Sequence, residues 1–240
     1  MIKHILFDLD GTLLAIGLED LIKTYMALLG KKMAGLGYDA EVIIKAVWAG
    51  TYAMLKNDGT KPNREVFWET FATFGLGNVK TIEDQVDSFY TNEFCGVRRV
   101  LKEERSLREL VDGLKEKGYT ISLATSPIFP FIGVKERLSW IGLTPDDFIV
   151  VTSYENCRFC KPQLGYYQDV LNAAGFTAEE SLMVGNDLSD DMPAGELGIQ
   201  TYLVTDVLEH HQEGYEKKYT HGTFAQLQEF LKNLPEIKDE

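Results

Sequence analysis

Phe7-Asp8-Leu9-Asp10-Gly11-Thr12-Leu13 is the decisive stretch in a chain of 240 residues. Its first residue, Phe7, is also the last residue of a short apolar run that begins at Ile5. A continuous apolar run of this length, bounded by turn residues, is typical of a buried strand. Two carboxylates, Asp8 and Asp10, therefore come directly after a strand, and Gly11 allows a turn in which backbone N–H groups face an anion. About one Asp-x-Asp pair is expected by chance in a chain of this composition. The interpretation therefore depends on the residues at the ends of the other strands.

Short apolar strands alternate with helical patterns from about residue 98 onward. Such alternation is typical of a parallel sheet with helices on both faces. The sequence therefore predicts an α/β fold, with a three-layer, Rossmann-like parallel sheet core that the strand at residues 5–7 joins. Expected strands are 119–124, 148–151, 181–184 and 201–204, and expected helices are 106–117, 131–141, 163–174, 190–197 and 223–233.

The segment between the first and second expected strands contains helical patterns only. We expect about four amphipathic helices there, enough for a small bundle. Gly30 suits the end of the first, Asp39 and Asn63 suit the starts of the next two, and Thr81 with Asp84 resembles a capping box. The predicted domains are a core formed by residues 1–14 and 97–240 and an inserted, all-helical domain at 15–96.

Polar side chains come after each of the predicted core strands. Thr125 and Ser126 follow the second strand, Lys161 comes after the third, and residues 185–191 follow the fourth with the sequence Gly-Asn-Asp-Leu-Ser-Asp-Asp. In open parallel sheets, ligands bind beyond the carboxyl ends of the strands. Carboxylates, hydroxyls and a lysine at one edge predict a site for a phosphate together with a divalent cation.

Composition narrows the classes of partner. The chain has 24 Lys and Arg against 37 Asp and Glu, a net charge of -13, which argues against nucleic acid or an anionic membrane as a partner. It contains no apolar run of about 18 residues, so no membrane span is expected. Three cysteines are too few for a disulfide framework, and the expected setting is the cytoplasm.

The four segments in this order resemble the motifs of the haloacid dehalogenase (HAD) superfamily of phosphohydrolases. Residues 7–13 match the first motif completely, Thr125 resembles the second, Lys161 with Pro162 the third, and residues 185–192 a variant of the fourth. The resemblance covers the whole chain, and the inserted helices resemble the C1 cap domain of that family. It implies a Mg²⁺-dependent phosphatase that acts on a small phosphorylated metabolite.

The resemblance also implies roles for individual residues. Asp8 would attack phosphorus and form an aspartyl-phosphate, and Asp10 would act first as general acid and then as general base. Thr125, Ser126 and Lys161 would bind the phosphoryl oxygens, and the turn at Gly11 would present backbone N–H groups to them.

The metal ligands implied by the resemblance are Asp8, the Asp10 backbone carbonyl and an acid from the fourth motif. This chain departs from the usual motif, because Asn186 stands where an aspartate is common and Asp187 comes next. A carboxylate binds Mg²⁺ better than an amide does, which favours Asp187. Asp191 is expected to be the second acid, which positions water, Lys161 or the metal.

Two other functions share these motifs. A phosphoglucomutase-like isomerase has the same core residues, and a non-catalytic phosphate-binding protein could have the same fold. The presence of Asp10 favours phosphoryl transfer over cleavage of a carbon–halogen bond, because the halocarbon-cleaving relatives lack an acid there.

Two further patterns are assigned structural roles. Cys157 and Cys160 form a C-x-x-C pair, and a zinc or redox site with His210 and His211 is conceivable, but reduced loop cysteines are favoured. The aromatic residues of the insertion are expected to pack that domain rather than to bind substrate: Trp48, Tyr52, Phe67, Trp68, Phe71 and Phe74.

Overall fold

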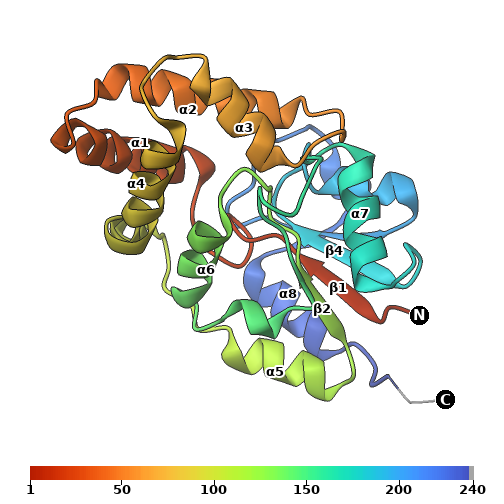
Figure 1. The fold of residues 1–240 in the computed structure, drawn as a ribbon. Helices are drawn as coiled ribbons and strands as arrows, with labels where there is room; N and C mark the ends of the chain where they lie inside the picture. The colour runs from red at the N-terminus through yellow and green to blue at the C-terminus, as the bar shows by residue number, and fades with distance from the viewer. Residues whose placement is uncertain (238–240) are drawn as a thin grey trace.

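A computed structural model describes residues 1–237 of the chain, and Figure 1 shows a six-stranded parallel sheet at its centre. The strand order is β3-β2-β1-β4-β5-β6. The predicted α/β core with a parallel sheet is therefore confirmed, with β1 joining the sheet between β2 and β4. The strands are β1 (His4–Phe7), β2 (Thr120–Leu123), β3 (Val150–Val151), β4 (Ser181–Gly185), β5 (Gln200–Val204) and β6 (Thr220–Gly222).

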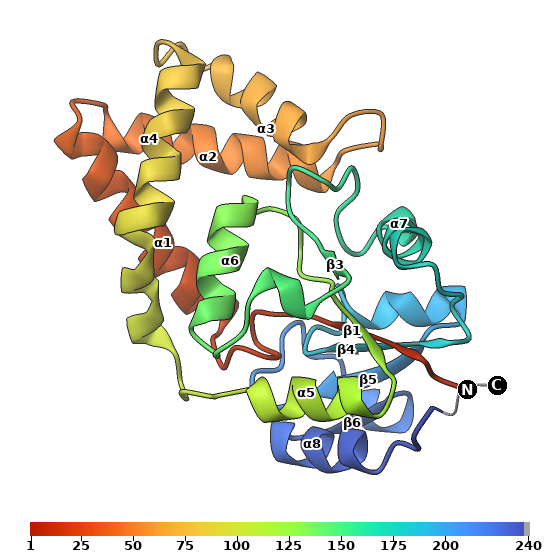
Figure 2. The ribbon, with the colours of Figure 1, turned by 60° about the horizontal axis from the view of Figure 1, so that its bottom comes forward.

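Helices cover both faces of the sheet, which gives three layers. Helices α5 (Arg108–Glu116) and α8 (Phe224–Lys232) pack together on one face, whereas α7 (Leu164–Ala174) and the 3-10 helix η3 (Met192–Leu197) lie on the other (Figure 2). The side chains of β1 alternate accordingly. Ile5 and Phe7 belong to the core cluster that includes α5 and α8, and Leu6 belongs to the cluster on the α7 side.

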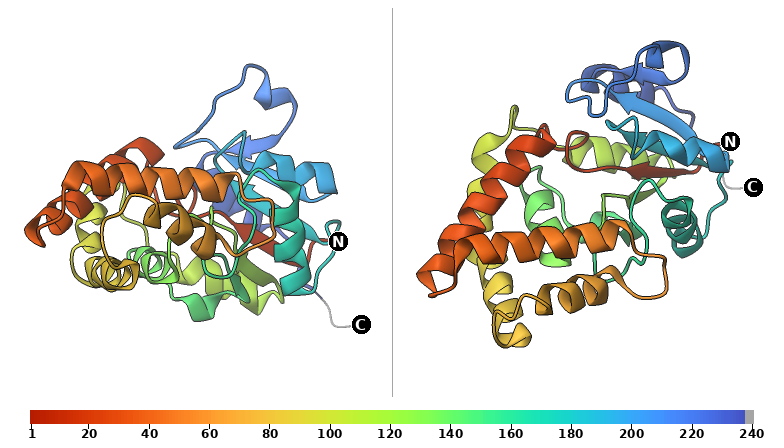
Figure 3. Two further views of the ribbon diagram at one scale, coloured as in Figure 1. Left: turned by 45° about the horizontal axis from the view of Figure 1, so that its top comes forward. Right: turned by 90° about the horizontal axis from the view of Figure 1, so that it is seen from above.

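The segment between β1 and β2 is helical, as predicted. It contains α1 (Leu18–Gly35), α2 (Ala40–Leu55), α3 (Asn63–Ala72), α4 (Val79–Asn92) and the 3-10 helix η1 (Phe94–Val100). These helices lie together to one side of the sheet, as Figures 1 and 3 show. The division into a separate domain at residues 15–96 stays a prediction. None of the helices in residues 1–237 is long and apolar enough to cross a membrane.

Helix α6 (Phe131–Ser139) comes after β2 and packs against α4 and η1, so it joins the core to the inserted helices. The contact is close, because a Cβ at Gly133 of α6 would lie 2.7 Å from the ring of Tyr90 in α4. Two short 3-10 helices, η2 (Pro145–Asp147) and η4 (Tyr215–Lys217), occupy loops of the core.

Asp39 caps α2 as predicted, since its carboxylate accepts from the N–H groups of Glu41 and Val42. The helix ends predicted at Gly30, Asn63 and Thr81 were wrong. Gly30 lies inside α1, where it is buried beside Ala40 and Ile44 of α2, so contact between the two helices decides its position. The other two errors concern helix starts. Asn63 is the first residue of α3 rather than its cap, and Asn78 caps α4 by accepting from Thr81 N–H.

Two core elements also differ from the prediction. The expected helix at 190–197 is instead the 3-10 helix η3, which begins at Met192, has Pro193 in its first turn and ends before Gly198 in the left-handed conformation. Strand β6 was missed because Thr220, His221 and Gly222 carry no apolar pattern, and the strand forms by pairing with β5 at the sheet edge.

Candidate active site

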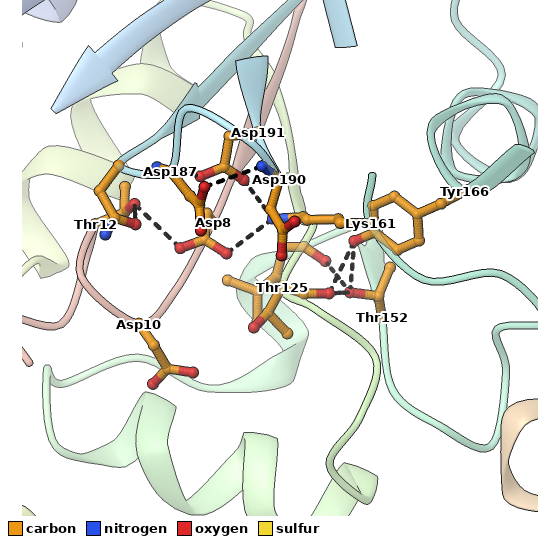
Figure 4. A network of polar contacts seen from close by, with 12 residues as sticks. Asp8, Asp10, Thr12, Thr125, Thr152, Lys161, Tyr166, Asp187, Asp190 and Asp191 are labelled. Atoms are coloured by element: carbon orange, nitrogen blue, oxygen red, sulfur yellow. Dashed lines mark hydrogen bonds and ion pairs between the residues drawn. The ribbon is translucent and has the colours of Figure 1, made fainter. Parts of the chain in front are cut away.

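The polar residues that come after β1, β3 and β4 meet at one edge of the sheet, as Figure 4 shows. The ammonium of Lys161 lies 2.9 Å from Asp8 Oδ1 and 2.6 Å from Asp191 Oδ1. Asp8, Lys161 and Asp191 are all buried. The sheet topology therefore brings together three of the predicted residues from positions up to 183 residues apart in sequence.

Electrostatics favour the charged form of Lys161. Burial alone would lower the pKa of Lys161, but the carboxylates of Asp191 and Asp8 outweigh it and raise that pKa well above its usual value. Burial raises the pKa of Asp191, against the opposing effects of the Lys161 ammonium and the Asp187 N–H. The Lys161 ammonium thus lies between two carboxylates.

The turn after β1 brings Asn186 close to Asp8. Gly11 has φ of 87°, and a Cβ at this position would lie 2.1 Å from Asn186 Nδ2, so only glycine fits. That nitrogen donates to the Val207 carbonyl at 2.6 Å, which turns Asn186 Oδ1 toward Thr12. The Thr12 hydroxyl lies 3.0 Å from Asn186 Oδ1 and 3.1 Å from Asp8 Oδ2.

Asp187 has other partners. Its Oδ1 accepts from the N–H groups of Ser189 and Asp190, at 2.7 and 3.0 Å, and Oδ2 lies 2.8 Å from His210 Nδ1. The hydrogen bond that His210 donates to the Asp187 carboxylate raises the pKa of His210. The sequence suggested His210 only as a conceivable zinc ligand. His210 lies beside Asp187 because the backbones of Asp187 and Glu209 form a bridge, and the sequence does not reveal this pairing.

Asp10 forms an ion pair that the sequence did not predict. Its Oδ2 contacts Arg137 Nη1 of α6, and the guanidinium lies over the ring of Phe129 at 4.4 Å from the centroid. Arg137 is fully buried, whereas the Asp10 side chain is 15% exposed and lies apart from Lys161 in Figure 4. Burial raises the pKa of Asp10 to about 6, although Arg137 opposes the change. A carboxyl group with this pKa exchanges a proton readily near neutral pH.

Thr125 and Ser126 line the same cavity as Asp8 and Lys161. Thr125 is buried, and its backbone carbonyl accepts from the hydroxyls of Thr152 and Tyr166, at 2.7 and 2.8 Å. These bonds fix the backbone at the end of β2. The residues predicted to bind phosphate therefore face the predicted nucleophile across one cavity.

The donor set near Asp8 fits a Mg²⁺ ion. Asp8 Oδ2 and Asn186 Oδ1 both lie within hydrogen-bond distance of the Thr12 hydroxyl, whose single hydrogen can serve only one of them. Within residues 1–237, no three His, Cys, Asp or Glu side chains gather into a cation site. A carboxylate and an amide oxygen at this position suit Mg²⁺, which prefers one or two carboxylates completed by water and phosphate oxygens.

The C-x-x-C pair lies near the site, and within residues 1–237 it belongs to no group of three His, Cys, Asp or Glu side chains that could hold a metal ion. Cys157 and Cys160 are free thiols, and burial raises the pKa of each to about 12. The Cys160 sulfur accepts a hydrogen bond from Asn63 Nδ2 at 3.3 Å, which connects α3 to the core. Thiols with such pKa values are protonated at neutral pH and weak as nucleophiles or metal ligands.

A Rossmann-like parallel sheet with carboxylates and a lysine buried at the carboxyl ends of its strands defines the class of phosphatase-like α/β hydrolases. Comparison with known proteins agrees: residues 5–204 match the family model of haloacid dehalogenase-like hydrolases. The chain belongs to this family, as the sequence resemblance implied.

Similar proteins are consistent with a phosphatase-like member. A glyceraldehyde 3-phosphate phosphatase of Methanocaldococcus jannaschii is 28% identical over 98% of this chain and 99% of its own length. A phosphoglycolate phosphatase of Agrobacterium fabrum is 23% identical over 83% of this chain and 79% of its own. The crystal structure of a HAD phosphatase from Thermococcus onnurineus has the same fold, with a TM-score of 0.59 and 20% identity over 98% of this chain and 100% of that one.

Proposed function

We propose that the chain is a Mg²⁺-dependent phosphatase that hydrolyses a small phosphomonoester through an aspartyl-phosphate on Asp8. The observation that carries the proposal is the position of Asp8 at the bottom of a cavity, between the Lys161 ammonium and the Thr12 hydroxyl. These two neighbours contact different oxygens of the carboxylate and so hold it in one orientation. Related proteins named as phosphatases support the same reaction class.

In the proposed reaction, an Asp8 oxygen attacks phosphorus and the bond to the leaving oxygen breaks. Asp10 gives its proton to the leaving oxygen and then takes a proton from the water that hydrolyses the phosphoenzyme. The pKa of Asp10, raised to about 6, suits both directions of transfer. Lys161 and the residues after β2, Thr125 and Ser126, bind the phosphoryl oxygens.

Asp8, the Asp10 backbone carbonyl and Asn186 would hold the Mg²⁺ ion. When bound, Mg²⁺ supplies positive charge that allows an anionic nucleophile to approach an anionic phosphate. We assign Asn186 rather than Asp187 because Asn186 Oδ1 shares the Thr12 hydroxyl with Asp8, while both oxygens of Asp187 have other partners. Asp191 positions Lys161.

The experiment is release of phosphate from p-nitrophenyl phosphate with Mg²⁺. Asp8→Asn should reduce turnover by at least about 10³-fold, because covalent catalysis then lacks its nucleophile. Asp20→Asn, on the exposed surface of α1, is the matched control and should not change turnover. Near-normal turnover of Asp8→Asn would contradict the assignment, and a requirement for a sugar bisphosphate would favour the mutase.

A second measurement separates the two aspartates. Asp10→Asn keeps the nucleophile but lacks the acid and base, so phosphoenzyme should accumulate with an ester whose leaving group needs no proton. Intact-mass analysis after an acid quench should show added phosphate on Asp10→Asn and none on Asp8→Asn. Equal labelling of the two variants would mean that their roles are wrongly assigned.

We also propose that residues 15–96 form a cap that closes over the site. Its support is a set of hydrogen bonds from the start of α3 to the core: Asn63 N–H donates to Cys157 O and Arg64 N–H to Tyr154 O, each at 2.8 Å. If closure accompanies ligand binding, these amides should exchange hydrogen more slowly when orthovanadate and Mg²⁺ are bound. Unchanged exchange would argue for a fixed lid.

A further inference from the structure

A cavity of about 470 Å³ extends from Asp8 and Lys161 to the inner sides of α1–α4. This volume lies within the usual range for small-molecule sites, about 300–1,000 Å³. We call the part that faces the inserted helices the chamber. Its wall on that side is built from Tyr25, Ile43, Val47, Phe67, Trp68 and Val86, among others. The aromatic residues therefore do more than pack the insertion, since Phe67, Trp68 and Phe71 also face the cavity.

The chamber has no charge on the side of the inserted helices. Every Asp, Glu, Lys or His side chain that lines the cavity belongs to the core, and residues 15–96 contribute only apolar, hydroxyl and indole groups. A leaving group with a carboxylate would meet no cation there. A short polar leaving group such as a hydroxy acid requires charged partners when it is buried, and this side of the chamber supplies none.

Three polar groups of the chamber wall donate to partners within the protein. The Tyr90 hydroxyl donates to the Tyr25 hydroxyl at 3.1 Å, and Trp68 Nε1 donates to the Tyr154 hydroxyl at 3.3 Å. The Thr51 hydroxyl donates to a backbone carbonyl of its own helix at 2.9 Å. A substrate hydroxyl that needs one of these three donors would have to displace its bond, and an unpaired buried polar group is unfavourable.

Apolar side chains of α1 and α2 form part of the rim of the cavity, which Glu209 and His210 of the core also line. Leu18 at the start of α1, with Trp48 and Leu55 of α2, lines the cavity and also remains 40%, 48% and 40% exposed. Exposed apolar side chains that continue a lined cavity are typical of a ligand-binding surface. Apolar side chains of α1 and α2 therefore continue from the rim into the chamber.

We propose that the substrate is a phosphomonoester of an apolar alcohol, alkyl or aryl, whose carbon skeleton fills the chamber while its phosphate meets Asp8 and Lys161. The proposal rests on the proposed phosphatase function and names its substrate class. The dianionic end of the substrate would lie among charged core residues, and its uncharged end among the side chains of α1–α4.

The experiment is a series of n-alkyl phosphates, from ethyl to octyl, assayed for phosphate release with Mg²⁺. The acidity of the leaving alcohol is nearly constant along the series, so the trend reports contact with the chamber. We expect kcat/KM to rise about fourfold for each added methylene, which corresponds to about 0.8 kcal/mol, until the chamber is filled. Glycerol phosphate should be a poorer substrate than propyl phosphate, which has the same carbon skeleton.

Two substitutions on α2 provide the matched pair. Trp48 lines the cavity, whereas Tyr52, one turn further, is 57% exposed and does not. Trp48→Ala should flatten the rise with chain length, and Tyr52→Ala should leave it unchanged. Equal effects of the two variants would overturn the role given to the chamber.

The outcomes separate the two proposals. Release of phosphate with no dependence on chain length, or with glycerol phosphate preferred over propyl phosphate, would overturn the apolar substrate class and leave the phosphatase function standing. No release from any of these esters or from p-nitrophenyl phosphate would overturn the phosphatase function, and this inference with it.

Discussion

Replacement of Lys161 by methionine tests the central ion pairs of the site, because methionine keeps an unbranched shape and removes the charge. Lys161 Nζ lies 2.9 Å from Asp8 and 2.6 Å from Asp191, and the side chains of Lys161 and Asp191 are each 1% exposed. In Lys161→Met, two carboxylates would remain buried without a cation between them. The same variant should also lose most of its activity, because Lys161 binds the phosphoryl group in the proposed reaction.

The loss of stability can be estimated from burial. Removing one partner of a buried ion pair costs about 3–5 kcal/mol, because the remaining charge is uncompensated. Burial already raises the pKa of Asp191, and loss of Lys161 raises it further. The folded variant then binds a proton more tightly than the unfolded chain does. Its penalty is therefore small below about pH 4 and grows as the pH rises toward the folded pKa of Asp191.

Urea unfolding in the presence of EDTA measures this effect. At about pH 8 we expect Lys161→Met to lose at least about 3 kcal/mol, and at about pH 5 clearly less. Adding Asp191→Asn should restore part of the loss at the higher pH. Lys45→Met is the control, since Lys45 pairs with Glu41 on the exposed surface of α2 and should lose less than about 1 kcal/mol. A small loss that does not depend on pH would refute the reasoning.

Buried contacts lead to three further predictions. Arg137→Met should lower the free energy of unfolding by about 3 kcal/mol, because it leaves the carboxylate of Asp10 unpaired. Arg137→Lys keeps a positive charge and should lose less. Equal losses of the two variants in urea unfolding would contradict a role for the charge. His4 is buried between Ser122 and Ser181, and burial lowers its pKa to about 4, so the unfolded chain takes up a proton first as the pH falls. The wild type should therefore lose about 2.5 kcal/mol of stability between about pH 7.5 and 4.5 that His4→Gln does not lose, and parallel pH profiles would exclude this contribution. Asn186→Ala should raise the Mg²⁺ concentration for half-maximal activity more than Asp187→Ala does, since Asn186 Oδ1 lies beside Asp8 near Thr12; the reverse order would return the metal position to Asp187.

The sheet and the cluster at its edge could be predicted because both depend on local pattern. Apolar runs specify buried strands, and parallel pairing brings their carboxyl ends to one edge whatever the length of chain between them. Asp8, Lys161 and Asp191 were found in this way, across a helical insertion and two crossovers. The wrong helix ends at Gly30 and Asn63 arose where contact between elements outweighs local propensity.

Side chains that act through a partner could not be predicted in this way. Arg137 lies 127 residues from Asp10, and nothing in the sequence of α6 distinguishes this arginine from a solvated one. His210 reaches Asp187 only because a loop after β5 pairs with the loop after β4. The chamber likewise consists of ordinary apolar residues, whose second role depends on which side of each helix faces Asp8.

The charges around the proposed phosphate site explain why cation and substrate should bind together. Among residues 1–237, Lys161 is the one lysine that lines the cavity, and the nearby Arg137 is paired with Asp10. Five aspartates line the same cavity: Asp8, Asp10, Asp187, Asp190 and Asp191. A dianionic phosphate brought alone into this surplus of negative charge would be repelled. A divalent cation at Asp8 and a proton on Asp10, whose pKa is raised to about 6, each reduce the surplus, by up to two charges and one charge respectively. Because linkage is reciprocal, a phosphate that binds better with Mg²⁺ must also strengthen Mg²⁺ binding. In the proposed reaction, the small donor set near Asp8 would leave a ligand position for an oxygen of the substrate. The proposed apolar leaving group would add no further charge to the site.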